Sequence, residues 1–233
     1  LVVADNCDDD TAAVAREAGA EVIDRIDAIH RGKGFALDFG VRHLSAQPPA
    51  MVLIVDADCL LDAGALDNLA GLCTGSGRPA QALYEMNAPA DSGLRARVSA
   101  FAWRVRNRVR PLGWWRIGAP CQLMGTGMAF PWPLLHDAPL ASGNIVEDVQ
   151  LGVDLALRGA PPLFVPQARV TSEFPAADDA AAAQRRRWEH GNLALMLRHG
   201  PRLLLAALTR AESRLAAMAA DLMVPPLALL VQL

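Results

Sequence analysis

The stretch VLIVDADCLL, residues 52–61, joins an apolar run to two aspartates. Residues 52–55 are typical of a strand that is buried on both faces. Asp56 and Asp58 follow directly, and side chains at positions i and i+2 of a strand share a face. Two like charges placed that close repel each other unless a cation or solvent relieves them. The stretch therefore predicts either a plain polar loop after a core strand or a site for a metal or phosphate.

Short apolar runs of the same kind alternate with helical patterns through the first half of the chain. Strands are predicted at residues 1–5, 20–25, 51–58 and 80–87, and helices at 8–19, 34–46 and 63–73. This alternation favours crossover units, so we expect an α/β fold with a mostly parallel, Rossmann-like sheet flanked by helices. Ligands of such sheets bind beyond the carboxyl ends of the strands, where Asp5, Asp56 and Asp58 lie.

The second half of the chain is less regular. The pattern predicts a helix from residue 94 that breaks at Pro111 and Gly113, a glycine-containing strand or turn at 122–132, and a helix at 145–159. It then predicts two short strands within 162–174, a long helix at 178–200 and another at 202–220.

Composition limits the classes of function. The chain has 233 residues, of which 52% are hydrophobic and 20% charged, which suits a packed core in one large domain or in one domain plus an appendage. The net charge of -3 does not favour nucleic acid as a partner. The four cysteines form no C-x-x-C pair, which fits reduced thiols in a cytosolic compartment. No signal peptide and no apolar run of transmembrane length is present.

Two further groups of residues could carry chemistry, although each has an ordinary explanation. Glu147 and Asp148 open a helix, where acidic residues favour the helix dipole, but a carboxylate there could also act as a general base. Lys33 stands between two glycines before a helix, as a plain loop lysine or as a contact to a diphosphate.

The third group is Q-x-x-R-W. Gln184, Arg187 and Trp188 are spaced i, i+3 and i+4, on one face of a helix. Arginine gives bidentate phosphate contacts and tryptophan a plane on which a sugar can stack, whereas the ordinary alternative is a basic surface stripe with a core tryptophan.

The chain resembles the family 2 glycosyltransferases, because it carries D-x-D, E-D and Q-x-x-R-W in this order on a fold of alternating strands and helices. The likeness is to the membrane-associated branch that contains cellulose, hyaluronan and poly-N-acetylglucosamine synthases. It implies a GT-A fold, a nucleotide-sugar donor, usually a UDP-sugar, and Mg²⁺ or Mn²⁺. It also implies transfer to a saccharide or lipid-linked acceptor with inversion at the anomeric carbon, in surface or extracellular polysaccharide synthesis.

The resemblance also implies roles for donor-binding residues. Asp5 matches the early aspartate that contacts the nucleoside, and Lys33 the basic position near the diphosphate. Asp56 matches the D-x-D residue nearer the nucleotide. Asp58 matches the metal ligand, and Asp56 is expected to be a second ligand of the same metal.

Other matches concern catalysis and the acceptor. Asp148 matches the catalytic base, with Glu147 as its acidic neighbour, and Gly125, Thr126 and Gly127 match the small-residue turn beside the acceptor. The group Gln184, Arg187 and Trp188 matches the motif that closes over donor and acceptor.

The two ends of the chain depart from that pattern. The family's first strand would precede Leu1, so we expect residues 1–200 to be a catalytic domain that lacks this strand. Residues 201–233 are predicted as an interfacial helix leading into the start of a possible transmembrane segment. These features predict a protein at the cytoplasmic face of the cell membrane.

Two rival functions stay open at this point. A sugar nucleotidyltransferase would share the alternating sheet and the metal-binding aspartates, but Q-x-x-R-W argues against it. A non-catalytic nucleotide-sugar-binding module would need no base, and donor binding without transfer or hydrolysis would identify it.

Overall fold

A computed structural model of the chain describes residues 1–88, 93–141, 146–174 and 178–225. Within these ranges, the side chains of residue 95, residues 178–190 and residue 192 are not described.

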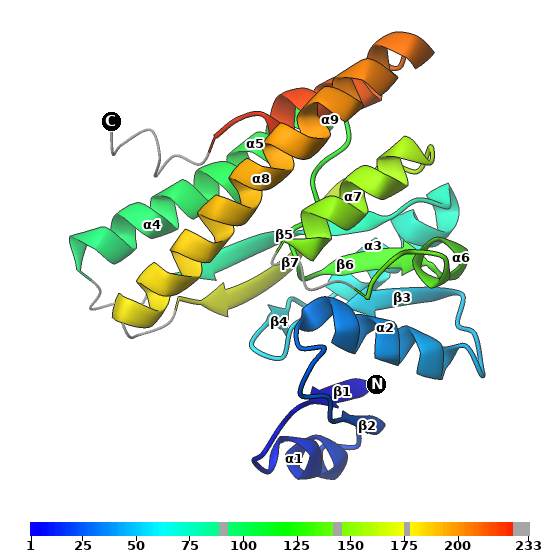
Figure 1. The fold of residues 1–233 in the computed structure, drawn as a ribbon, viewed down its shortest axis with the longest axis vertical. Helices are drawn as coiled ribbons and strands as arrows, with labels where there is room; N and C mark the ends of the chain where they lie inside the picture. The colour runs from blue at the N-terminus through cyan, green and yellow to red at the C-terminus, as the bar shows by residue number, and fades with distance from the viewer. Residues whose placement is uncertain (89–92, 142–145, 175–177, 226–233) are drawn as a thin grey trace.

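The strands form two sheets (Figure 1). In the smaller sheet, β1 (Val2–Asp5) pairs in parallel with β2 (Val22–Arg25). The larger sheet has the order β3-β6-β5-β7-β4. Its strands are β3 (Met51–Ile54), β6 (Met128–Pro131), β5 (Ala80–Asn87), β7 (Leu163–Glu173) and β4 (Leu60–Leu61).

The fold class α/β is confirmed, but the prediction of a mostly parallel sheet is wrong. Among the described strands, β5 and β7 are parallel, whereas the pairs β3–β6, β5–β6 and β4–β7 are antiparallel. The helical segment of residues 94–116 and an irregular segment after it lead from β5 to β6, and β6 then enters between β3 and β5 in the direction opposite to both. Strand and helix alternation along the chain carries no signal for such an inserted strand.

Helices cover both faces of the larger sheet. Tightly buried side chains of α3 (Ala65–Ser76) pack on one face, against β5 and β7. On the other face α2 (Lys33–Leu44), α6 (Trp132–His136) and α7 (Glu147–Leu157) pack around Ile54 and Phe130. The small helix α1 (Thr11–Glu17) lies with β1 and β2 at the N-terminal end of the molecule (Figure 1).

The long helical segment after β5 is continuous, so the predicted break at Pro111 and Gly113 is wrong. It runs as α4 (Leu94–Arg104), a π-helical turn η1 (Val105–Val109) and α5 (Arg110–Arg116). Pro111 lies in the first turn of α5, a position that tolerates the missing N–H of proline. The two short strands predicted within 162–174 are a single strand, β7, with a register shift opposite Ala82 and Leu83.

The C-terminal helices also differ from the prediction. α8 (Asp178–Arg210) passes through Pro201 without ending, so the expected division after residue 200 falls inside it. The chain turns at Ala211, which has φ 51°, and continues as α9 (Ser213–Leu222). Buried Leu195 and Leu203, on either side of Pro201, hold α8 against α7 and α9.

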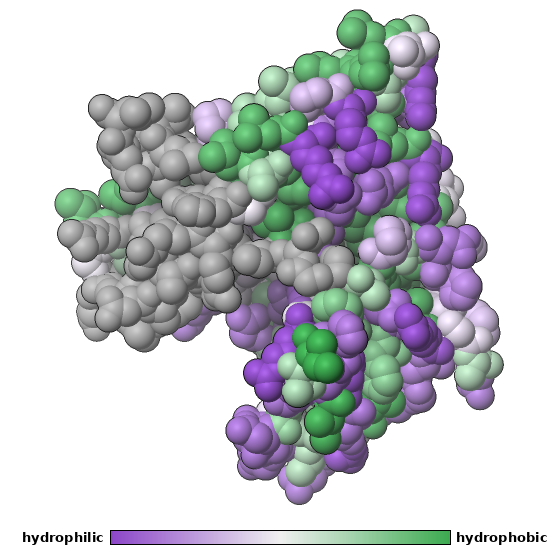
Figure 2. All heavy atoms as spheres, in the orientation of Figure 1, coloured by the Kyte–Doolittle hydropathy of each residue, from purple (hydrophilic) through white to green (hydrophobic). Residues whose placement is uncertain are grey.

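The far end of α8 also carries exposed apolar side chains. Leu204, Leu205 and Leu208 are exposed, and hydrophobic residues gather at that end of the helix in Figure 2. Within the described residues, none of the helices combines the length and apolar character needed to cross a membrane.

Candidate active site

The two aspartates that follow β3 lie in a tight turn, not on the strand. β3 ends at Ile54, and the backbone N–H of Cys59 donates to the carbonyl of Asp56 at 3.0 Å, which closes the turn before β4. The prediction that Asp56 and Asp58 share a strand face is therefore wrong. The turn still brings their oxygens together, because ligand atoms of Asp56, Asp58 and Cys59 all lie within 4.8 Å of one another.

Lys33 joins this turn to a distant part of the sequence. It is the first residue of α2, and its ammonium contacts Asp56 Oδ1 and donates to the carbonyl of Gly125 at 2.7 Å. The backbone N–H of Asp56 donates to Thr126 Oγ1 at 3.1 Å. Three of the groups predicted from sequence, Lys33, the D-x-D turn and the Gly-Thr-Gly turn, thus meet in space.

The Gly-Thr-Gly turn is held by a residue that the sequence reasoning missed. Gln81, fully buried on β5, donates from Nε2 to the Thr126 carbonyl at 2.9 Å and accepts the Met124 N–H at Oε1, at 2.8 Å. The only available signal was an amide within an apolar strand, which requires hydrogen-bond partners when buried.

Glycine is required in this turn for both conformation and space. Gly125 and Gly127 have φ of 89° and 63°, in the left-handed region. A Cβ at Gly127 would lie 2.7 Å from Val170 Cγ2 and 2.9 Å from Ala82 Cβ. A Cβ at Gly125 would lie 3.5 Å from Asp148 Oδ2 and 3.8 Å from Lys33 Nζ, so the turn runs between these two charges.

Glu147 and Asp148 begin α7 and face this turn. Burial, and then repulsion by Asp148, raise the pKa of Glu147 to about 7. Burial raises the pKa of Asp148 too, although the Val149 N–H, Arg106 and Lys33 oppose that rise. A small cavity of about 20 Å³ between α2 and α7 is bordered by both carboxylates. The site thus combines the Lys33 ammonium with several carboxylates that repel one another, an arrangement typical of acid–base or cation-binding chemistry.

The residues present fit a divalent metal ion. Asp56 and Asp58 supply hard oxygen ligands of the kind that Mg²⁺ and Mn²⁺ bind, and Asp58 is exposed, so most of an octahedral shell could come from water and a ligand. Cys59, the third member of the cluster, was not predicted; its Sγ donates to Asp58 Oδ1 at 3.4 Å, and burial raises the pKa of its thiol.

Asp5, at the end of β1, is tied to another part of the structure. Its Oδ1 accepts hydrogen bonds from Arg25 Nη1 at 2.6 Å and Asn6 Nδ2 at 3.0 Å. Arg25, at the end of β2, also binds Asp27 at 3.1 Å and the His30 carbonyl at 2.7 Å. Arg25 was missed because its partner Asp5 is brought to it by the parallel pairing of β1 and β2.

The remaining predicted group lies on α8. Gln184, Arg187 and Trp188 fall within this helix, so their spacing places them on one helical face. Their side chains lie outside the described residues.

Another missed residue is Arg106 of η1, which is partly buried and whose charge favours ionised Asp148. Burial lowers the pKa of the Arg106 guanidinium, while Asp148 acts in the opposite direction.

Comparison with known proteins gives consistent results. A family model described as "Glycosyltransferase like family 2" matches residues 1–191. The uncharacterized glycosyltransferases Rv0539 of Mycobacterium tuberculosis and Mb0553 of Mycobacterium bovis are each 33% identical over 169 residues, covering 65% of this chain and 72% of the relative.

A solved structure shows the same fold. The mannosyltransferase PcManGT from Pyrobaculum calidifontis, in complex with GDP-Man and Mn²⁺, aligns with a TM-score of 0.63 and 19% sequence identity. The alignment covers 94% of this chain and 60% of that chain, so this chain spans less than two thirds of the neighbour. The similarity supports the GT-A fold, with the mixed sheet described above.

Proposed function

The chain belongs to the family 2-like glycosyltransferases, and from this premise we propose that it transfers a sugar from a nucleotide-sugar donor to a saccharide or lipid-linked acceptor, with inversion. The observation that carries the proposal is the meeting of Lys33, Asp56 and the Gly125–Gly127 turn beside Asp148. The family match favours this function over a sugar nucleotidyltransferase or a non-catalytic binding module.

Donor binding is assigned to the Lys33 side of the site. Asp56 and Asp58 would hold Mg²⁺ or Mn²⁺, which when bound supplies positive charge against the leaving diphosphate. Lys33 already lies against Asp56 and would turn toward the diphosphate, and Asp5 would contact the nucleoside. Gln184, Arg187 and Trp188 would close over the donor from α8. We propose a UDP-sugar as donor; because PcManGT binds GDP-Man, GDP-mannose is the second donor to test.

Catalysis is assigned to Asp148, next to the turn that would receive the acceptor. Its carboxylate would take the proton of the acceptor hydroxyl while that oxygen attacks the anomeric carbon. The bond to the nucleotide diphosphate breaks on the opposite side, which inverts the configuration. Glu147, with its pKa raised to about 7, would act as a second acidic group beside this base.

We further propose that the complete protein works at the cytoplasmic face of the cell membrane, in surface or extracellular polysaccharide synthesis. Supporting it are the exposed Leu204, Leu205 and Leu208 of α8, with Arg202 and Arg210 on the same segment, an arrangement typical of interfacial helices.

In α9, by contrast, Leu215 and Met218 are fully buried, so the proposed contact is through α8. Fractionation of cells that express the full-length gene tests this: recovery of the enzyme in the membrane fraction supports the assignment, and enzyme wholly in the detergent-free soluble fraction would contradict it.

The activity itself is tested by a panel of UDP-sugars and GDP-mannose with Mn²⁺ and the full-length protein. We expect release of nucleotide from one donor, faster when an acceptor is present, and loss of that acceleration in Asp148→Asn. Tight donor binding without release of nucleotide or transfer of sugar would instead identify a binding module.

A further inference from the structure

The helical segment formed by α4, η1 and α5, called the α4–α5 rod below, carries charge of one sign only. Residues 93–117 contain seven arginines and no aspartate or glutamate, whereas the whole chain has 22 basic and 25 acidic residues. In Figure 1 the rod lies on the side of the molecule away from β1 and β2. Covering a sheet requires no such excess of cations, so the rod is a candidate surface for an anionic partner.

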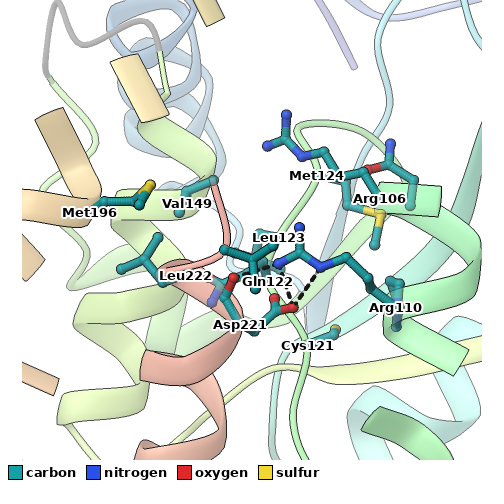
Figure 3. Close-up of a pocket in the computed structure, with 13 residues that line it drawn as sticks. Arg106, Arg110, Cys121, Gln122, Leu123, Met124, Val149, Met196, Asp221 and Leu222 are labelled. Atoms are coloured by element: carbon teal, nitrogen blue, oxygen red, sulfur yellow. Dashed lines mark hydrogen bonds and ion pairs between the residues drawn. The ribbon is translucent and has the colours of Figure 1, made fainter. Parts of the chain in front are cut away.

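Packing at two points fixes which face of the rod points outward. In α4, the Trp103 ring packs edge-on against the rings of Tyr84 and Phe174, with centroids 5.4 and 6.1 Å apart. At the start of α5, Arg110 Nη2 lies 2.6 Å from Asp221 Oδ1 of α9, a contact drawn in Figure 3. The rod therefore cannot turn about its axis without losing contacts to the sheet and to α9, and its outer face is preformed.

The arginines divide between the interior and this outer face. Arg106 and Arg110 line the cavity of about 60 Å³ shown in Figure 3, between the rod and α9. Arg97, Arg104 and Arg116 are exposed, and none of these three forms an ion pair within the part of the chain that the structure describes. The outer face thus presents cations that the fold itself does not use.

An apolar stripe runs along the same outer face. Leu94, Val98 and Phe101 of α4 are 77%, 52% and 66% exposed. Their spacing of four and then three residues places them on one side of the helix. Trp103, two residues after Phe101, points to the opposite side and into the core. The stripe is therefore exposed because the other face of α4 is the one that packs on the sheet.

The outward arginines border this stripe. Arg97 and Arg104 each follow a stripe residue, Leu94 and Phe101, by three positions, so they lie along one edge of it. Val109 is 59% exposed and lies 15 residues after Leu94. Because a π turn takes up about one residue more than an α turn, η1 returns Val109 to the stripe after about four turns.

This combination favours a lipid surface over other anionic partners. A helix with apolar side chains along one face and cations beside them is typical of helices that lie in a membrane interface. A nucleic acid would engage the arginines through its phosphates but would leave the apolar centre of the face in water. A second copy of this chain would bring two rows of arginines together, because a twofold dimer pairs the same surface with itself.

We propose that the α4–α5 rod docks on the surface of a membrane that contains anionic lipids. Leu94, Val98 and Phe101 would enter the headgroup region, and Arg97 and Arg104 would lie against the lipid phosphates. The proposal rests on the membrane location proposed above and adds to α8 a second contact that selects anionic lipid. Both contacts lie away from β1 and β2 (Figure 1), so the N-terminal end of the molecule would face the water from which a nucleotide sugar arrives.

The test is flotation of the 233-residue chain with vesicles, either of phosphatidylcholine alone or with about one third phosphatidylglycerol. We expect binding to the anionic vesicles to be at least about tenfold tighter than to the neutral ones. The difference should disappear in about 1 M salt, which screens charges beyond about 3 Å.

Val98→Glu tests the stripe, and Val14→Glu is the matched control. The two valines are similarly exposed, 52% and 56%, but Val14 lies in α1, at the β1–β2 end of the molecule. Each substitution removes the same side chain and adds one negative charge at an exposed position, so both variants should keep the wild-type melting temperature. Val98→Glu should weaken binding to anionic vesicles by about tenfold or more, and Val14→Glu by less than about twofold.

The double variant Arg97→Gln/Arg104→Gln tests the charge. Each arginine near an anionic surface changes the binding constant about fivefold, so this variant should bind anionic vesicles about 25-fold more weakly and neutral vesicles unchanged. Arg16→Gln/Arg42→Gln removes the same charge from exposed positions of α1 and α2 and should change binding by less than about twofold.

Equal binding to both kinds of vesicle would overturn the proposal, as would anionic binding that Val98→Glu and the Arg97/Arg104 variant both retain. Binding that is lost only in Leu205→Glu/Leu208→Glu would leave α8 as the membrane contact and sink the rod. A dimer in solution that Val98→Glu dissociates, without vesicle binding, would assign the stripe to a second copy. Flotation does not depend on turnover, so failure of every donor would sink the proposed sugar transfer and leave this result standing.

Discussion

Replacing Glu147 with glutamine should stabilise the fold, and only at neutral to alkaline pH. Glu147 begins α7, partly buried beside Asp148, and its pKa rises from 4.5 to about 7 because burial and that second carboxylate disfavour its charge. Glutamine keeps the shape of the side chain and removes the charge, so the variant isolates the electrostatic penalty that the site carries.

The sign follows from proton linkage. Below the unfolded pKa both states hold the proton, and the wild-type residue has no pH-dependent effect. Between the two pKa values the unfolded chain releases the proton while the folded chain keeps it, so the free energy of unfolding falls as pH rises. Above about pH 7 Glu147 is charged in both states, and its full electrostatic penalty on the free energy of unfolding is present. Each pKa unit corresponds to about 1.4 kcal/mol, which gives about 3 kcal/mol for this shift. Partial exposure of Glu147 screens the charge, so we expect about 2 kcal/mol.

The measurement is urea unfolding at pH 5 and pH 8, followed by tryptophan fluorescence, with a chelator present to remove divalent metal. At pH 8, Glu147→Gln should raise the free energy of unfolding by about 2 kcal/mol, and at pH 5 by less than about 1 kcal/mol. Glu17→Gln, an exposed carboxylate at the end of α1, should change either value by no more than about 0.5 kcal/mol. Equal stabilisation by Glu147→Gln at both pH values, or none at pH 8, would refute the reasoning.

Three further predictions concern other residues of the site. Asp148→Asn should lower turnover about 10²- to 10⁴-fold and retain donor affinity, and wild-type activity should rise with pH because burial raises the pKa of the proposed base; near wild-type transfer would assign the role elsewhere. Gly127→Ala should lower the free energy of unfolding by about 2–4 kcal/mol in urea, because its methyl meets β5 and β7 side chains at positive φ. Gly159→Ala, at φ 88° in open space, is the control and should lose about 1–2 kcal/mol; equal losses would contradict the steric argument. Asp58→Ala should weaken Mn²⁺ binding in the presence of UDP, measured by calorimetry, and the wild type should bind Mn²⁺ more weakly without UDP; unchanged affinity in either comparison would count against the metal assignment.

The sequence predicted the features that depend on local pattern. The strand at residues 80–87 has the predicted bounds, and the acidic pair does begin a helix. Each of these follows from hydrophobic periodicity or from a short motif at an element's end.

Features that depend on pairing between distant segments were not predictable in this way. The antiparallel insertion of β6 has no local signature, since either strand direction buries the same apolar residues. Gln81 and Arg106 acquire their surroundings from segments about 40 residues away along the chain. The π-turn depends on one extra residue in a helix whose pattern is otherwise ordinary.

Gly191 divides α8 into a short N-terminal part and a longer C-terminal part. Gly191 is in close contact with Val146, where a Cβ would lie 3.0 Å from Cγ2, so the helix is supported next to the start of α7. Counted along the helix from Gly191, Arg210 lies 19 residues away, about 28 Å. Trp188 lies three residues away in the other direction, about 4.5 Å. Leu195 and Leu203 pack the intervening turns against α7 and α9, so a displacement at the Arg210 end would be taken up by these contacts before it reached Trp188. Events at the exposed leucines would therefore reach the first turns of α8 as small shifts of position, not as large movements.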